Sequence, residues 1–161
     1  MRIRRLLSFI VGMVLILTGA IASAQAPPEY GAAITLEQAK KVMAGAEAEA
    51  AKNKWPVVIT ILDSGGNMMM VHRLDNAQFG SVDISREKAK SAVALRRPTK
   101  VFQDLIAQGG ANLRLLNIGY SVLEGGIPII AGGKVIGSIG VSGVTSQQDA
   151  QIAQAGIDAL K

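Results

Sequence analysis

The residue with the richest coordination chemistry is the one histidine of the chain, His72, which follows the methionine run Met68–Met70. Side chains alternate between the two faces of a β-strand, so a strand here places His72 with Met68, Met70 and Leu74 on one face. Thioether sulfur and imidazole nitrogen are ligands for copper and for haem iron. Methionines that fill a core beside a solvent-accessible histidine fit the same pattern, and both interpretations stay open.

A second group of candidate residues lies between Asp83 and Lys90. Ser85 and Lys88 match the SxxK pattern of serine acyl-enzymes, in which a lysine activates a serine one helical turn away. The companion motifs of those enzymes do not occur in the sequence, which favours a chance match. Asp83 and Glu87 could hold a hard cation from one helix face, but we favour a solvated face on which they flank Lys88 and Lys90.

The glycine-rich run Gly137–Gly143 follows a predicted strand and invites comparison with nucleotide-binding loops. Its spacing is GxxGxxG and not the GxGxxG of dinucleotide-binding folds, and the chain has no GxxxxGK[ST] phosphate loop. We therefore interpret these glycines as positions at which strands or a ligand approach the backbone closely.

Composition removes several further classes of site, because the sequence contains no cysteine and one histidine. Disulfides, thiolate metal sites, iron–sulfur clusters and thiol catalysis are excluded. A multi-histidine metal cage is excluded too, as is any Ser-His-Asp triad that does not use His72 as its base.

The N-terminal residues have the three regions of a secretory signal peptide, in the usual order. Three arginines within the first five residues precede an apolar run over residues 6–17, and Ala22-Ser23-Ala24 supplies small residues for cleavage. An uncleaved anchor is the alternative, because residues 6–24 approach the length that spans a bilayer.

We predict a signal peptide over residues 1–24, a linker over 25–33 and one domain over 34–161, with a periplasmic or secreted mature protein that is not stably inserted in the membrane. The net charge of +5 falls to +2 without the three N-terminal arginines, since 14 basic residues then face 12 acidic ones. That small excess contains no basic run with interleaved aromatic residues, so nucleic-acid binding is not expected.

Periodic apolar residues predict four helices. The first spans residues 36–53 behind a capping box at Thr35–Gln38, and the second runs from Ser81 to a stop at Arg96-Arg97-Pro98. Thr99 is expected to cap a short third helix over Lys100–Gln108, and a cap-like opening at Ser146–Asp149 begins the last helix. Residues 113–123 are ambiguous between helix and strand.

Two hairpins are predicted between these helices. Residues 57–62 and 68–74 are strand-like runs joined by the turn cluster at 63–67, and residues 125–130 and 134–141 are joined by Ala131-Gly132-Gly133. Tight turns between paired strands favour an antiparallel arrangement. We therefore predict an α+β fold, in which a central antiparallel β-sheet is flanked by helices.

Several motifs, in this order, resemble those of the GlcG/HbpS haem-binding family over roughly residues 34–160. They are Ile61-Leu62-Asp63-Ser64-Gly65-Gly66-Asn67, Arg73-Leu74-Asp75-Asn76-Ala77, Glu87-Lys88-Ala89 with Arg97-Pro98-Thr99, Glu124-Gly125-Gly126-Ile127-Pro128-Ile129, Val135 to Gly143, and Gln148-Asp149. The resemblance implies a profilin-like α+β fold, assembly into homo-oligomers, and binding of haem with haem degradation in some members.

The resemblance also implies candidate haem ligands. Secreted haem-binding members use a threonine as an iron ligand, and Thr99, which follows Pro98, is the position that we match to it. The axial histidine that other members carry on the first helix has no counterpart in residues 36–53. His72 is the reserve iron ligand, because imidazole is intrinsically the better axial group.

Haem propionates need cations, and the candidates are basic residues near these motifs. They are Arg73, Lys88, Arg96, Arg97 and Lys100. The first functional hypothesis is therefore an exported haem-binding protein that stores, senses or degrades haem. The alternative is an accessory protein or enzyme acting on a small organic acid or catabolic intermediate, with Asp63, Glu87 and Lys88 available for proton transfer.

Assembly is the last expectation. The chain has three Phe, two Tyr and one Trp, and many of its apolar residues are small. Small residues allow close backbone approach, so we expect residues 127–130, residues 135–141 and the alanine-rich first helix to pack against copies of themselves in a symmetric homo-oligomer.

Overall fold

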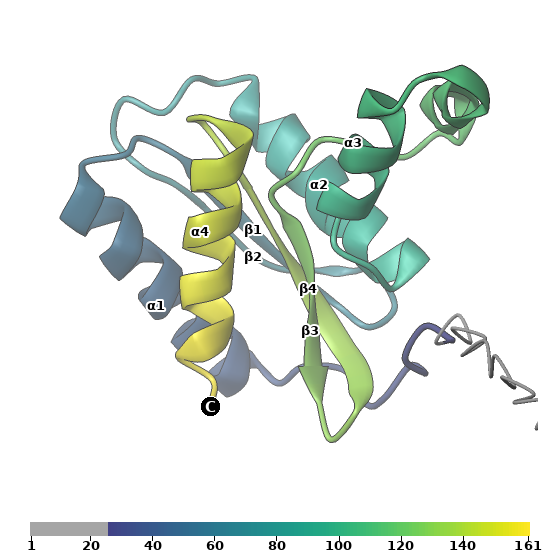
Figure 1. The fold of residues 1–161 in the computed structure, drawn as a ribbon. Coiled ribbons are helices and arrows are strands. Elements are labelled where there is room, and N and C mark those ends of the chain that lie inside the picture. The colour runs from purple at the N-terminus through teal and green to yellow at the C-terminus, as the bar shows by residue number, and fades with distance from the viewer. Residues whose placement is uncertain (1–25) are drawn as a thin grey trace, which may run out of the picture.

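The computed structural model describes residues 26–161, and the predicted signal peptide lies outside them. The described elements are α1 (Leu36–Asn53), β1 (Val58–Asp63), β2 (Met68–Arg73), α2 (Ser81–Leu95), α3 (Lys100–Ala107), the 3₁₀ helix η1 (Gly110–Asn117), β3 (Gly126–Ala131), β4 (Lys134–Ser142) and α4 (Ser146–Asp158). The strands form one sheet in the order β2-β1-β4-β3, with every neighbouring pair antiparallel (Figure 1). The predicted α+β fold is confirmed.

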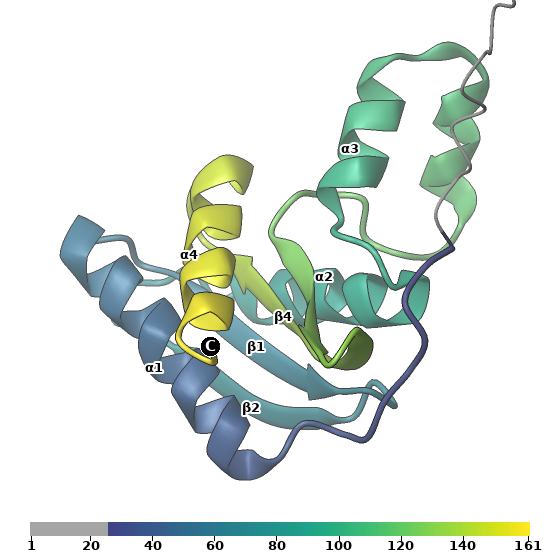
Figure 2. The same ribbon diagram turned by 60° about the horizontal axis from the view of Figure 1, so that its bottom comes forward.

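Helices cover both faces of this sheet. α1 and α4 lie side by side on one face, and α2 lies across the other (Figure 2). The layer between α1, α4 and the sheet is aliphatic, with Ile59, Ile61, Ile139 and Val141 all fully buried. Since adjacent residues of β1 point to opposite faces, Thr60 and Leu62 lie under α2. None of the helices of residues 26–161 is long and apolar enough to cross a membrane.

Capping explains where the two helices of the α1 face begin. Thr35 and Gln38 form the predicted capping box of α1, with reciprocal side chain to backbone bonds of 3.2 and 3.0 Å. The box of α4 consists of Thr145 and Gln148, one residue before the opening predicted at Ser146. The prediction was wrong by one residue, and the shift leaves the carboxylate of Asp149 available for a contact outside its own helix.

A β-bulge changes the predicted faces of β2. Met70 pairs with Ile61, but Met68 pairs with Leu62, so one extra residue of β2 lies between these pairs. Met68 therefore shares the face of Leu62, under α2, whereas Met70 and His72 share the α1 face. The prediction of Met68 on the face of His72 was wrong for this reason.

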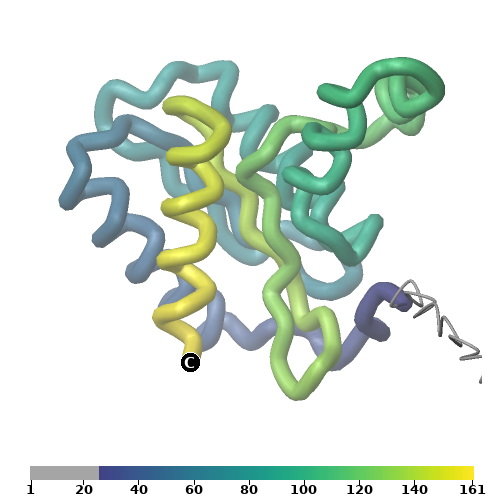
Figure 3. The backbone as a smooth tube through the Cα atoms, in the orientation of Figure 1, coloured from purple at the N-terminus to yellow at the C-terminus, as the bar shows by residue number. Residues whose placement is uncertain are grey.

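α3 and η1 form an arm that stands out from the layers, as the ribbon in Figure 2 and the tube in Figure 3 both show. The ambiguous segment 113–123 holds the end of η1 and a loop. Phe102 is the one buried residue of the two helices, and Leu113 and Leu116 are about half exposed. We call residues 100–117 the α3–η1 arm.

Two of the three surfaces predicted for packing between copies, on α1 and β4, lie inside the protein, whereas β3 is an edge strand on which Ile130 is 45% exposed. Ala39, Ala46 and Ala50 of α1 are fully buried against the rest of the chain, and residues 135–142 of β4 are buried as well. Alanine on α1 supports the packing of α1 on α4, so this part of the expectation was wrong.

Part of the predicted linker is fixed to the domain. The N–H of Val135 donates to the Glu29 carbonyl and the N–H of Gly31 donates to the Val135 carbonyl, both at 2.8 Å. The Tyr30 hydroxyl donates to the Val93 carbonyl of α2 at 2.9 Å, and the Arg96 guanidinium lies over the Tyr30 ring at 5.2 Å from its centre. We call residues 29–31 the N-terminal strap.

Candidate functional site

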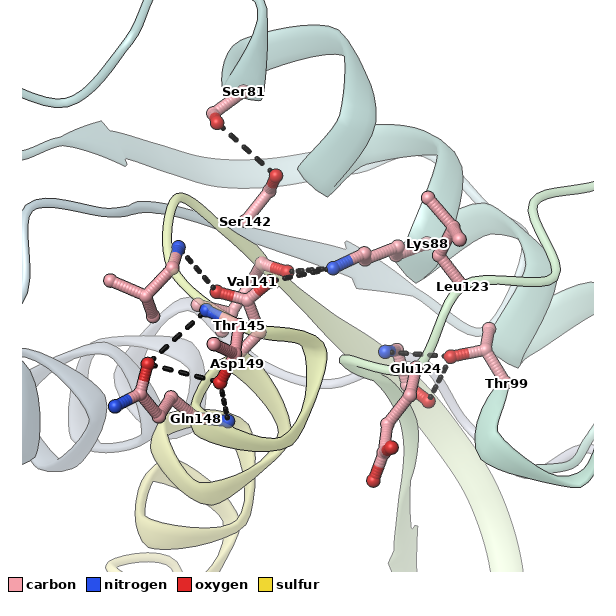
Figure 4. Close-up of polar contacts among 12 residues, drawn as sticks. Ser81, Lys88, Thr99, Leu123, Glu124, Val141, Ser142, Thr145, Gln148 and Asp149 are labelled. Carbon is pink, nitrogen blue, oxygen red and sulfur yellow. Dashed lines mark hydrogen bonds and ion pairs between the residues drawn. The ribbon is translucent and has the colours of Figure 1, made fainter. Parts of the chain in front are cut away.

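The most deeply enclosed charges of the described residues are Lys88 on α2 and Asp149 in the first turn of α4. Lys88 Nζ lies 2.7 Å from Asp149 Oδ2 and donates to the Val141 carbonyl at 3.0 Å, while 2% and 3% of the two side chains are exposed. Burial raises the pKa of the Asp149 carboxyl, and the hydrogen bond and charge of Lys88 oppose that rise. The pair joins helices on opposite faces of the sheet at the end of β4 (Figure 4).

Gly125 makes room for this ion pair. Its φ is +123°, and a Cβ there would lie 2.8 Å from Lys88 Nζ and 3.0 Å from Asp149 Cβ. The predicted role of Lys88 in contacting a propionate would require this enclosed pair to open. Its predicted position on a solvated face beside Asp83 and Glu87 was wrong, since only 2% of Lys88 is exposed.

The layer between α2 and the sheet contains buried hydroxyl groups beside its aliphatic residues. Ser85 Oγ lies 2.8 Å from Thr60 Oγ1 and donates to the Val82 carbonyl at 3.0 Å. Ser138 Oγ donates to the Ala89 carbonyl at 2.8 Å. Because Ser85 bonds to Thr60 while Lys88 bonds to Asp149, the SxxK match forms no nucleophile and base pair.

Thr99 precedes α3 and is fully buried beside Gly126, the first residue of β3. Its Oγ1 accepts the N–H of Gly126 at 3.0 Å, and its own N–H donates to the Gly126 carbonyl at 2.9 Å. Thr99 is the N-cap residue of α3, as predicted, but its side chain makes no capping bond to that helix. The hydroxyl instead ties the beginning of α3 to the edge strand, and a haem iron could reach it only if Gly126 were displaced.

His72 lies on the other face of the sheet. It pairs in register with Ile59, whose side chain belongs to the core under α1, and its Nδ1 lies 2.7 Å from Glu47 Oε1 of α1. Thr99 lies on the α2 side, because the position of a Cβ on Gly126 would touch both Lys88 and Thr99. His72 and Thr99 therefore cannot approach one iron from a shared cavity.

The predicted propionate cations are dispersed. Arg73 Nε donates to the Ala77 carbonyl at 2.9 Å, Arg97 is exposed, and Arg96 covers Tyr30 while donating to the Pro28 carbonyl. Lys100 Nζ lies 2.8 Å from both carboxylate oxygens of Asp104, a hydrogen bond that raises its pKa. These side chains do not converge.

The acidic candidates are dispersed as well. Asp63 accepts backbone N–H bonds from Gly65 and Asn67 in the β1–β2 turn, both at 2.8 Å. Glu87 lies 3.8 Å from both Arg86 and Lys90 on the outer face of α2. Within residues 26–161 no cluster of three or more His, Asp or Glu side chains could hold a metal ion.

A cavity of about 450 Å³ lies where the N-terminal strap, the β1–β2 turn, α2 and the loop after η1 meet. It is lined by Tyr30, Ser64, Gly65, Gly66, Lys90, Val93, Ala94 and Tyr120. We call it the tyrosine cavity. A second cavity of about 260 Å³ shares Gly66 and Lys90 with it and adds Arg86 and Met68. Cavities of this size with a few convergent polar groups are typical of small-molecule sites.

The two tyrosines of this cavity differ in their bonding. Tyr30 donates to the Val93 and Ala94 carbonyls at 2.9 and 3.1 Å. The Tyr120 hydroxyl makes no hydrogen bond within residues 26–161, so it is available to a ligand. Tyrosine oxygen is an established axial ligand of haem iron, and Lys90 offers a cation at the same cavity. Arg86 lines the neighbouring cavity with Lys90 and Glu87.

Sequence reasoning missed Tyr30, Tyr120 and Asp149 as candidate functional residues. The tyrosines come from distant parts of the chain, so no local motif links them. Their scarcity was the available signal, since the chain has two tyrosines. Asp149 lies in one of the family motifs, but its pairing with Lys88 depends on the capping shift of α4.

Comparison with known proteins identifies the family. The family of haem degrading proteins described as HbpS-like matches residues 34–158, and this chain belongs to that family. The resemblance to the GlcG/HbpS family is thereby confirmed. An uncharacterised 15.0 kDa protein from the dhaT-dhaS intergenic region of Citrobacter freundii is 42% identical over 130 residues, which cover 79% of this chain and 92% of that protein.

Two solved structures share the fold. HbpS of Streptomyces reticuli, solved as a double mutant, is 30% identical with a TM-score of 0.74 and covers 89% of this chain and 97% of its own. A PduOC protein solved as a haem complex is 29% identical with a TM-score of 0.72 and covers 79% and 94% of the two chains.

Proposed function

We propose that this protein is an exported haem-binding protein that holds haem in the tyrosine cavity. The observation that carries the proposal is the cavity of about 450 Å³, which places a phenol and a lysine at one opening. Membership of the HbpS-like family and similarity to a protein solved with haem support haem as the ligand.

Tyr120 is the first candidate for the iron ligand. Tyr120 lines the cavity, its hydroxyl has no hydrogen-bond partner among residues 26–161, and a deprotonated phenol binds ferric haem. Thr99 and His72 remain the ligands that the sequence predicts, and they are tested beside Tyr120. Lys90 and Arg86 are proposed to contact the propionates, because charge-assisted bonds to carboxylates are strong.

Haemin titration of the purified protein tests this proposal. We expect a saturable shift of the Soret band at one haem per chain, and Y120F should move the band and weaken binding by about tenfold or more. T99V and H72A should leave the spectrum unchanged. A spectrum equal to that of free haemin at all ratios would contradict haem binding, whereas an unchanged Y120F with an altered T99V or H72A would transfer the ligand role.

A separate experiment tests whether bound haem is degraded or retained. The haem complex is reduced without oxygen and then exposed to air. Loss of the Soret band with biliverdin-like absorbance would indicate degradation, whereas a stable band would indicate storage or sensing.

Export and assembly complete the proposal. The basic, apolar and small-residue order of residues 1–24 supports secretion, which N-terminal sequencing of the protein recovered from the periplasm or medium would test. The half-exposed leucines of the α3–η1 arm support a homo-oligomer, because contiguous exposed apolar residues mark interaction surfaces.

A further inference from the structure

A groove of about 360 Å³ lies between β3, the first half of α4 and the start of α3, away from the tyrosine cavity. Its lining is backbone and apolar side chains along β3, amides along α4, and one charged pair of residues at the end near α3. The residues are Pro98, Lys100, Glu124, Gly125, Gly126, Ile127, Gln147, Ala150, Gln151 and Gln154. Of the predicted haem residues, Lys100 alone lines this groove.

Glu124 is the residue that gives the groove a ligand preference. Only 6% of Glu124 is exposed. Its Oε2 accepts from Gln103 Nε2 at 3.3 Å, and its backbone N–H donates to Gln103 Oε1 at 2.9 Å. Figure 4 shows its carboxylate pointing away from Lys88 and Asp149, so the ion pair does not neutralise it.

The other carboxylate oxygen of Glu124 remains available. Its Oε1 makes no hydrogen bond within residues 26–161. No fully enclosed side-chain oxygen or nitrogen of those residues lacks a partner, so Oε1 keeps an opening to solvent. Glu124 lines the groove, which supplies that opening. The Glu124 carboxylate is largely buried and accepts one side-chain hydrogen bond, through Oε2. A donor group of a ligand in the groove could therefore bind Oε1.

The charge at this end of the groove is negative. Lys100 also lines the groove, but its Nζ is bound by both oxygens of Asp104 at 2.8 Å. Glu124, Asp104 and Lys100 together carry one net negative charge. An anionic ligand is disfavoured here, and the described residues provide no carboxylate cluster for a metal ion. A small organic cation fits both constraints.

We propose that this groove binds primary ammonium compounds, with the ammonium group on Glu124 and the carbon chain along Gly125–Ile127. An ammonium group has three donors, so Glu124 Oε1 can accept one and the amide oxygens of Gln147 or Gln151 can accept others. A Cβ on Gly125 or Gly126 would point inward, toward Lys88, so these two residues face the groove with backbone atoms. This site is independent of haem in the tyrosine cavity.

Ligand-observed NMR with n-butylammonium tests the site on the purified protein. We expect saturable transfer to butylammonium at millimolar concentrations, and none above background to 1-butanol or butyrate. E124Q keeps the shape of the side chain and removes its charge, so we expect at least about tenfold weaker binding. E37Q, an equivalent change at an exposed position of α1, should bind as the wild type does.

A second variant keeps the test decisive if E124Q fails to fold. Ala150→Leu fills the groove from α4 while Glu124 keeps its carboxylate, and it should also abolish the butylammonium signal. Equal binding of butylammonium by the wild type, E124Q and A150L would overturn the proposal, as would equal binding of 1-butanol or the absence of any saturable signal. Addition of haemin should leave the butylammonium titration unchanged, so the outcome does not depend on the haem proposal.

Discussion

The enclosed pair of Lys88 and Asp149 makes the two layers of helices interdependent. Two charges that are almost completely removed from water stabilise a fold only while both are present. Either single variant, K88M or D149N, should lower the free energy of unfolding by about 3–5 kcal/mol, because the remaining group loses its partner. Urea denaturation monitored by circular dichroism measures the change.

The double variant K88M/D149L is the control for this prediction. It replaces both charges by apolar groups, and we expect it to be more stable than either single variant. Single variants within about 1 kcal/mol of the wild type would show that water compensates the remaining charge.

Asp63 gives a prediction about pH. Burial raises its pKa, but hydrogen bonds from Asn67 and from the backbone N–H groups of Gly65 and Gly66 outweigh that effect and hold the pKa below its ordinary value of 3.8. The carboxylate form is thus favoured by folding, so its stabilisation is present above pH 3.8 and is lost as the pH falls through the lowered value.

The measurement is the free energy of unfolding in urea between about pH 6 and about pH 2.5. D63N should lose less stability than the wild type over the acidic part of that range, because it has no carboxylate to protonate. Asp83→Asn, at an exposed position of α2, should follow the wild type. Parallel curves for the wild type and D63N would contradict the role of Asp63 in the turn.

Among the elements, the contact of α2 with β4 depends most on a missing side chain. A Cβ on Gly140 would overlap the Ser85 carbonyl oxygen and the backbone N of Ala89. G140A should therefore destabilise the fold by about 1–3 kcal/mol or more, because α2 would have to move away from the sheet. Thermal denaturation measures the loss.

Gly80 supplies the matched control for Gly140. A Cβ there would meet nothing within 4 Å, and its φ of −61° suits any residue. Gly80→Ala should change stability by less than about 1 kcal/mol and can raise it. If both variants unfold at the wild-type temperature, α2 and β4 can accommodate a methyl group at position 140, and the expected overlap with α2 would be contradicted.

The elements also show what the sequence can predict. Local rules located the helices and both hairpins, because capping boxes, prolines and turn glycines act within a few residues of themselves. The faces of β2 were harder, because one bulge at Met69 reverses the side of Met68. The cap of α4 moved by one residue, since Thr145 and Ser146 are both good capping residues.

The candidate site was less predictable than the fold. Tyr30 and Tyr120 meet only through the packing of the strap and the loop after η1, and nothing near either residue in the sequence specifies the other. Thr99 stands in a recognisable motif, but its hydroxyl bonds with a residue on a strand 27 positions later. Such pairings follow from topology and not from local sequence preference.

For the whole molecule, we predict that copies of the chain associate through the exposed leucines of the α3–η1 arm. Leu113 and Leu116 are 48% and 59% exposed on helices that pack chiefly on each other. Leu116→Glu should convert an oligomer to a smaller species in light scattering without changing the far-ultraviolet circular dichroism spectrum. A monomeric wild type, or an L116E variant of unchanged mass, would place the contacts elsewhere or exclude assembly.

The N-terminal strap has a consequence for the order in which the protein is built. A ribosome makes Tyr30 early, whereas its partners Val93 and Val135 follow much later, the first of them 63 residues on. The strap must therefore wait, unpaired, until β4 has been synthesised and placed in the sheet. Tyr30 lines the tyrosine cavity, so this cavity forms among the last events of folding. A ligand that contacts Tyr30 can therefore bind only after the whole chain has been synthesised and folded.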